Sequence, residues 1–254
     1  MLVCQPKKII FVQIPGAECD SLNRAIASSA LDCHKEHEFG RAANRYPRFA
    51  ESLPLLTKSG IDCKDYFKLV LVRNPYHRLI DIWQDYYKSP EDNIYRDSLL
   101  DNLRFTFARH TGLNPFPAQE FHQMYPEGDF RSFIFFLDDI LSKFRLDLAR
   151  KYIGAADQYS YIDNDSWTEF DYIASYETLN LDIANLNQKF DLKIIELLCD
   201  REQNQEEQMK FAEFYDEETL KIVNRLFIRD FVYFGYEKMS LLELERGRLM
   251  LANS

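Results

Sequence analysis

The sequence FKLVLVRNPYHRLIDIW, at residues 67–83, decides the fold of this chain. Its first six residues are mostly apolar and hardly alternate with polar ones, which is typical of a strand buried on both faces. Residues 73–75 end the strand because they contain Asn-Pro, and a helix is predicted over residues 76–87. The segment therefore predicts a strand, a short loop and a helix in direct succession.

Two further stretches of the chain repeat this order. Residues 7–14, KKIIFVQI, contain a short run of β-branched and aromatic residues with almost no alternation. Pro15 and Gly16 end this run, and a helical pattern starts at Ser21. Residues 172–176 are predicted as another strand, followed by a helix over residues 179–190. Strands that alternate with helices favour an α/β fold with a parallel sheet.

The remaining segments are less regular. Pro115, Pro117 and Pro126 deny residues 89–128 a long regular element, so a loop or lid is predicted there, with one short helix near residues 99–108. The apolar spacing over residues 133–141 predicts a helix that Ser132 would cap. A last helix is predicted to start at Asp216, which can cap it, and to bury its face from Leu220 to Phe231.

Length and composition indicate a single globular domain. The chain has 254 residues, of which 46% are hydrophobic, and it has no internal repeat or Gly/Ser/Pro-rich linker, so one domain over residues 1–254 is predicted. The apolar stretch at residues 9–14 is too short to span a bilayer, so no transmembrane segment is expected. Five scattered cysteines without a CxxC pair indicate reduced thiols, and we expect a cytoplasmic protein.

The charge distribution restricts the kind of ligand. A net charge of −10 argues against general binding of nucleic acid or anionic membranes. Residues 1–80 nevertheless hold twelve Lys/Arg against eight Asp/Glu, so the first third of the chain is positive. An anionic ligand would be better received there, although ordinary surface variation explains the asymmetry equally well.

Two loops follow predicted strands, at the end of the sheet where α/β proteins bind ligands. The first, IPGAECDSL at residues 14–22, has the length of a phosphate-binding loop. It has no lysine and does not match GxxxxGK[ST], which argues against a nucleotide kinase. The second is RNP at residues 73–75.

Four segments resemble, in the same order, the carbohydrate-type sulfotransferase family, whose members use 3′-phosphoadenosine-5′-phosphosulfate (PAPS). They are residues 14–22, residues 72–83 (VRNPYHRLIDIW), residues 171–182 (DYIASYETLNLD) and residues 227–236 (FIRDFVYFGY). The resemblance implies a P-loop-NTPase-like three-layer α/β domain, with a central parallel sheet flanked by helices. It also implies transfer of a sulfuryl group from PAPS to a hydroxyl acceptor, expected to be a saccharide.

The resemblance assigns candidate residues to the donor site. Arg73 matches the arginine that binds the 3′-phosphate of the donor, since a guanidinium offers a forked set of N–H groups to phosphate oxygens. Arg78 is expected to brace the helix or to pair with an acid. The other candidate donor-binding residues are Gly16, Ala17, Cys19, Ser21, Arg24 and Asp81.

The donor loop departs from the family pattern at charged positions. Gly16 replaces the family lysine that stabilises the sulfate, Glu18 and Cys19 replace a glycine pair, and Asp81 replaces a serine near the 3′-phosphate. Two interpretations stay open. Either Lys7, Lys8, Arg24 or a lid residue supplies the missing charge, or the chain is a catalytically inactive binding or scaffold protein.

A catalytic base is needed to deprotonate the acceptor hydroxyl. His34 and His37 are the candidates, although a polar surface loop explains them as well, and Glu51 is a further option. His77 belongs to the second loop and is a candidate contact of the nucleotide, although packing at the helix N-terminus explains it equally well. No metal site is predicted, because the Cys-His-x-x-His pattern that begins at Cys33 lacks the paired ligand spacing of a zinc site.

Overall fold

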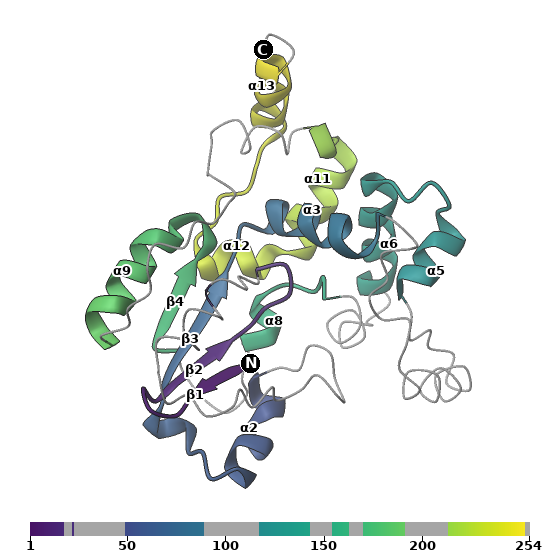
Figure 1. Cartoon of the computed structure of the whole chain (residues 1–254). Coiled ribbons are helices and arrows are strands. Elements are labelled where there is room, and N and C mark those ends of the chain that lie inside the picture. The colour runs from purple at the N-terminus through teal and green to yellow at the C-terminus, as the bar shows by residue number, and fades with distance from the viewer. Residues whose placement is uncertain are drawn as a thin grey trace. The chain divides into compact units, whose positions relative to one another are not determined.

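The computed structural model describes residues 1–17, 22, 49–88, 117–142, 154–162, 170–190 and 213–251 (Figure 1). These residues form two compact units, and each unit is built from two chain segments. The first unit comprises Met1–Asn74 and Gln158–Gln208, and the second comprises Pro75–Asp157 and Met209–Ser254. The single domain expected over residues 1–254 stays a prediction.

A four-stranded sheet forms the centre of the first unit. Its strands are β1 (Leu2–Cys4), β2 (Ile9–Val12), β3 (Phe67–Val72) and β4 (Tyr172–Ser175), in the spatial order β1-β2-β3-β4. β2, β3 and β4 are parallel, as the sequence predicts, and β1 is antiparallel to β2. The sheet is thus mixed but mostly parallel, because a short N-terminal hairpin adds an unpredicted strand at one edge.

Helix α9 (Leu179–Phe190) covers one face of this sheet and lies beside β4 in Figure 1. Alternate residues of the strands point to that face and form one hydrophobic cluster with the helix. The cluster consists of Leu2, Cys4, Ile9, Phe11, Leu22, Leu69, Leu71, Ala174, Leu179, Ile183 and Leu186. Ile10, Val12, Val70 and Val72 on the other face are buried too, which explains why these strands lack alternation.

Shorter elements complete the first unit. They are α2 (Phe49–Lys58), the 3₁₀ turn η1 (Cys63–Asp65), α8 (Tyr159–Ile162) and the 3₁₀ turn η3 (Tyr176–Thr178). α2 contacts α8 and η1, and the Phe49 ring packs against Phe170 at 5.3 Å between centroids. No pattern in the sequence predicted α2.

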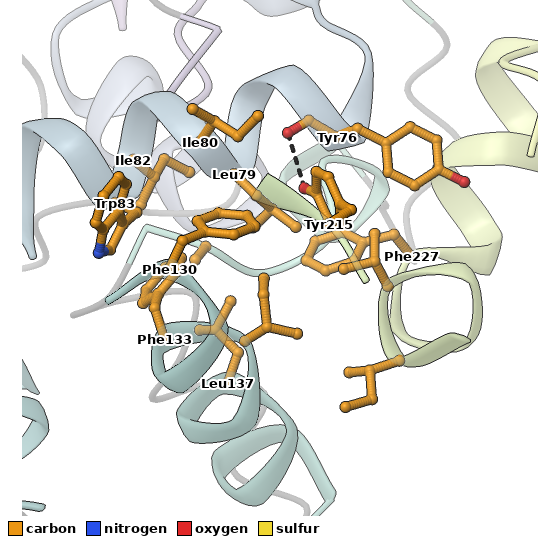
Figure 2. Packing of buried hydrophobic residues seen from close by; sticks show 14 of the residues in the cluster. Tyr76, Leu79, Ile80, Ile82, Trp83, Phe130, Phe133, Leu137, Tyr215 and Phe227 are labelled. Carbon is orange, nitrogen blue, oxygen red and sulfur yellow. Dashed lines mark hydrogen bonds between the residues drawn. The ribbon is translucent and has the colours of Figure 1, made fainter. Parts of the chain in front are cut away.

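The second unit consists of helices around an aromatic core. They are α3 (Pro75–Tyr86), α5 (Pro117–Met124), α6 (Phe130–Ser142), α11 (Glu217–Leu226), α12 (Ile228–Phe234) and α13 (Leu241–Leu251). Figure 2 shows the Tyr215 hydroxyl directed toward the backbone carbonyl of Tyr76 in α3, and Trp83 of the same helix packs against Phe130 of α6 at 5.7 Å between ring centroids. The Tyr215 hydroxyl donates to the carbonyl of Tyr76 at 2.9 Å, so this buried polar group has a partner.

Three local expectations for the second unit differ from the structure. α5 is a helix inside the segment expected to be a loop, and Pro117 opens it at a position where proline is tolerated. α6 starts at Phe130, because the Asp129 carboxylate accepts the Ser132 backbone N–H at 2.7 Å and thus caps the helix in place of Ser132. The last predicted helix is interrupted at Phe227, and α12 and α13 follow it.

Among the described helices, none combines the length and the apolar composition that crossing a membrane requires.

Candidate functional site

The candidate site lies where β2, β3 and β4 end at their carboxyl termini. Val12 pairs with Val70 and Val72 pairs with Ser175, so the three parallel strands end at the same edge of the sheet. The residues that follow them are 13–17, 73–74 and 176–178, all within the first unit. This is the edge at which α/β proteins place their ligands.

The first loop opens with a tight turn over Ile14–Ala17. The Ala17 N–H donates to the Ile14 carbonyl at 3.1 Å, with Pro15 and Gly16 at the two central positions. Gly16 has a φ of 72°, the left-handed conformation that the third position of a type II turn requires. A lysine at this position would be strained, and the Ala17 N–H is already bonded within the turn.

The backbone of Arg73 is held by one side chain. The Gln158 Oε1 accepts the Arg73 N–H at 2.8 Å, and the Gln158 Nε2 donates to the Arg73 carbonyl at 2.7 Å. Gln158 is fully buried and Arg73 is 8% exposed. The carboxamide therefore satisfies both backbone groups of the first residue beyond β3, as a neighbouring strand would.

The guanidinium of Arg73 lies over an aromatic ring. Its Cζ is 4.2 Å from the centroid of the Tyr176 ring, within the range of a cation–π contact. This contact helps to hold the guanidinium near the carboxyl ends of β3 and β4.

Two carboxylates complete the site from the β4 side. Glu177 accepts the Asn74 N–H at 2.7 Å through Oε1 and the Ser175 hydroxyl through Oε2. Asp182, which is 8% exposed, accepts the Ser175 N–H at 3.0 Å and the Tyr172 hydroxyl at 2.7 Å. Burial, together with the hydrogen bond to the Asp182 carboxylate, raises the pKa of Tyr172. The bond between Glu177 and Asn74 joins the end of β3 to the end of β4, and the Asp182 bonds attach α9 to β4.

Two other sequence candidates belong to the second unit. Arg78 is fully buried and donates to the carbonyls of Ala156 at 2.8 Å and Gly154 at 2.7 Å, so it braces a loop. Asp81 is partly buried on α3. That Asp81 contributes to donor binding stays a prediction, since Arg73 and the first turn belong to the other unit.

Five candidates lie outside the described residues: Cys19, Ser21, Arg24, His34 and His37. Their assigned roles, including catalysis by a histidine, stay predictions. Of the remaining candidates, Gly16, Ala17 and Arg73 follow the ends of β2 and β3, two neighbouring parallel strands.

Three residues that hold Arg73 and Asn74 were not among the sequence candidates. Tyr176 and Glu177 fall inside the third segment that resembles the sulfotransferases, and that segment could have marked them. Gln158 lies in a stretch without any motif, so nothing in the sequence indicated its contact with a residue 85 positions earlier.

Among the described residues, Arg73 suits a phosphate group of PAPS, but no described loop residue suits its sulfate. Arg73 offers a charged, forked donor of the kind that phosphate groups need. The described part of the first loop, residues 13–17, contains no cationic side chain for the sulfate.

The chain matches one known protein family over most of its length. The model of the sulfotransferase family matches residues 1–237, so the chain belongs to the sulfotransferase family. The mostly parallel α/β sheet flanked by helices is consistent with the P-loop-like fold of that family. Neither a curated protein nor a solved structure matches the chain significantly.

Proposed function

We propose that this protein transfers the sulfuryl group of PAPS to a hydroxyl of a saccharide. In this reaction the bond between sulfur and the bridging phosphate oxygen breaks, and a bond between sulfur and the acceptor oxygen forms. The acceptor gives up its proton, and 3′-phosphoadenosine-5′-phosphate (PAP) leaves. Membership of the sulfotransferase family supports the donor, and the saccharide rests on the resemblance to the carbohydrate-type members.

The observation that carries the proposal is the placement of Arg73. It is the first residue beyond the carboxyl end of β3, its backbone is bonded to Gln158, and its guanidinium is fixed over Tyr176. A guanidinium held in one position loses little conformational freedom when it binds phosphate, which favours affinity. We assign Arg73 to the 3′-phosphate of PAPS.

One observation favours a second function, that of an inactive nucleotide- or protein-binding member of the family. Gly16 stands where the family has its sulfate-stabilising lysine, and its left-handed φ disfavours any side chain there. A chain that binds the 3′-phosphate at Arg73 but lacks a cation at the sulfate would bind the nucleotide without accelerating transfer.

Titration with PAP tests donor binding. We expect PAP to stabilise the protein against heat, because a ligand that binds only the folded state shifts unfolding by mass action. Arg73→Ala should weaken the binding by about 1.5–3 kcal/mol, the range for a hydrogen bond to a charged group. Isothermal titration calorimetry measures this, with Arg246→Ala on the exposed side of α13 as a control that removes the same charge.

Three outcomes separate the two functions. If millimolar PAP does not stabilise the protein, both the PAPS-dependent enzyme and the inactive nucleotide-binding protein are contradicted. Binding together with transfer of ³⁵S from labelled PAPS to a panel of saccharides supports the enzyme. Binding that depends on Arg73, without transfer to any acceptor or to water, supports the inactive binding protein.

A further inference from the structure

Gln158 makes an unusual pair of bonds with the residue that carries the proposed function. Its carboxamide bonds both the N–H and the carbonyl of Arg73, and the side chain is fully buried. β3 ends at Val72, the last residue that pairs with β4. Gln158 thus extends the hydrogen bonding of β3 by one residue, to the position where the chain must present a charged group.

The backbone of the next residue, Asn74, is held in a similar way by the segment that follows β4. The Asn74 N–H is bonded to Glu177, which η3 supplies directly after β4. Tyr176, the residue before Glu177, provides the ring under the guanidinium. The backbone of residues 73–74 and the head group of Arg73 are therefore fixed by side chains from two separate segments.

We infer that Gln158 is a positioning residue for anion binding by Arg73, an inference that rests on the proposed donor function. A buried backbone N–H or carbonyl without a hydrogen-bond partner costs free energy. Removal of the Gln158 carboxamide would therefore shift the backbone at Arg73 to a conformation in which these groups form other hydrogen bonds. Such a shift would move the guanidinium off the Tyr176 ring. Gln158 acts through Arg73 and makes no contact with phosphate itself.

The distinguishing variant is Gln158→Met, which keeps the approximate volume of the side chain and removes both hydrogen bonds. Gln123→Met, at an exposed position of α5, is the matched control. We expect Gln158→Met to weaken PAP binding about tenfold, within the range for loss of buried hydrogen bonds. In an Arg73→Ala background the same change should alter affinity less than about twofold, because its effect passes through Arg73.

Two calorimetric results would overturn the inference. Equal losses of affinity in the wild-type and Arg73→Ala backgrounds would show a general structural role for Gln158. Unchanged affinity in a folded Gln158→Met protein would show that Arg73 needs no positioning. If Gln158→Met does not fold, Tyr176→Leu takes its place, because it removes the ring beneath the guanidinium and leaves Gln158 unchanged, and it should show the same dependence on Arg73.

A measurement without ligand separates this inference from the proposed function. The Nε–Hε group of Arg73 can be assigned by NMR through its absence in Arg73→Lys. We expect restricted motion of this group in the wild type and faster motion in Gln158→Met and Tyr176→Leu, but not in Gln123→Met. If the wild type does not bind PAP, the proposed donor function is wrong, and the NMR measurement alone tests the positioning role of Gln158. Faster motion of the Arg73 side chain in the two variants would then still support the positioning role. Unchanged motion would contradict the positioning role as well.

Discussion

Gly128 and Gly60 have similar left-handed backbones but different surroundings, with φ values of 64° and 76°. A Cβ at Gly128 would lie 3.0 Å from Cε1 of His122, whereas a Cβ at Gly60 meets no atom within 4 Å. We expect Gly60→Ala to cost about 1–2 kcal/mol of strain, and Gly128→Ala to cost more because of the added contact. Urea denaturation of both variants measures the loss in the free energy of unfolding. Equal losses would contradict a close contact between His122 and residue 128.

His122 should make stability depend on pH. Burial lowers its pKa from the ordinary value, although the backbone of Tyr87 opposes the shift. The folded state thus favours the neutral ring, so this contribution to stability is complete above about pH 6.5 and is lost as the pH falls below it. The urea midpoint of the wild type should drop more between pH 7.5 and pH 5.5 than that of His122→Gln. Parallel drops would mean that His122 titrates as an exposed group.

At the scale of single residues, the sequence identified Arg73 but not its neighbours. Arg73 follows a strand whose apolar run is unmistakable, so its place at the end of the sheet could be predicted. Gln158 bonds it from a segment 85 positions away, and no local pattern encodes such a contact. The turn at Pro15 and Gly16 could be placed from the sequence, because a Pro-Gly pair favours a turn, whereas the hydrogen bond from Ala17 to Ile14 that closes it was not predicted.

Three elements with strong apolar patterns were predicted almost to the residue, whereas β2 (Ile9–Val12) is two residues shorter at each end than the predicted strand at residues 7–14. β3 and α9 have the predicted bounds, and α3 differs by one residue at each end. Short or proline-containing elements were missed, among them β1 with three residues and α2 with Pro54 inside it. Such elements form because the rest of the first unit packs against them, which a local pattern does not reveal.

The start of α11 offers a test at the scale of a helix. The Asp216 carboxylate accepts the N–H groups of Glu218 at 3.0 Å and Thr219 at 2.8 Å, and it also pairs with Arg131 at 2.7 Å. Asp216→Ala should destabilise the protein by about 1–2 kcal/mol, because both bonds of the cap are lost.

Asp216→Asn separates the cap from the ion pair. Asparagine also caps helices well, and a largely exposed ion pair contributes about 0–1 kcal/mol. We therefore expect this variant to lose much less stability than Asp216→Ala in chemical denaturation. Similar losses would assign the effect to the ion pair with Arg131.

At the scale of the whole molecule, the chain continues past the family match, which ends at residue 237. α13 lies in this extension, and it buries Leu244 at 2% exposure in the core of the second unit while Leu242 is 68% exposed. Leu244→Ala should cost about 2–5 kcal/mol and Leu242→Ala less than about 0.5 kcal/mol. Thermal and urea denaturation test this, and equal effects would mean that α13 does not belong to the core.

The division into two units has a consequence for the gene as well. The chain passes from one unit to the other after Asn74, after Asp157 and after Gln208, so neither unit is encoded by one uninterrupted stretch. A premature stop codon near the middle would remove a segment of both units and leave two incomplete cores. Recombination could exchange either unit as a whole only by moving two separate coding segments together. We therefore expect the unit that contains Arg73 and the helical unit to be inherited together.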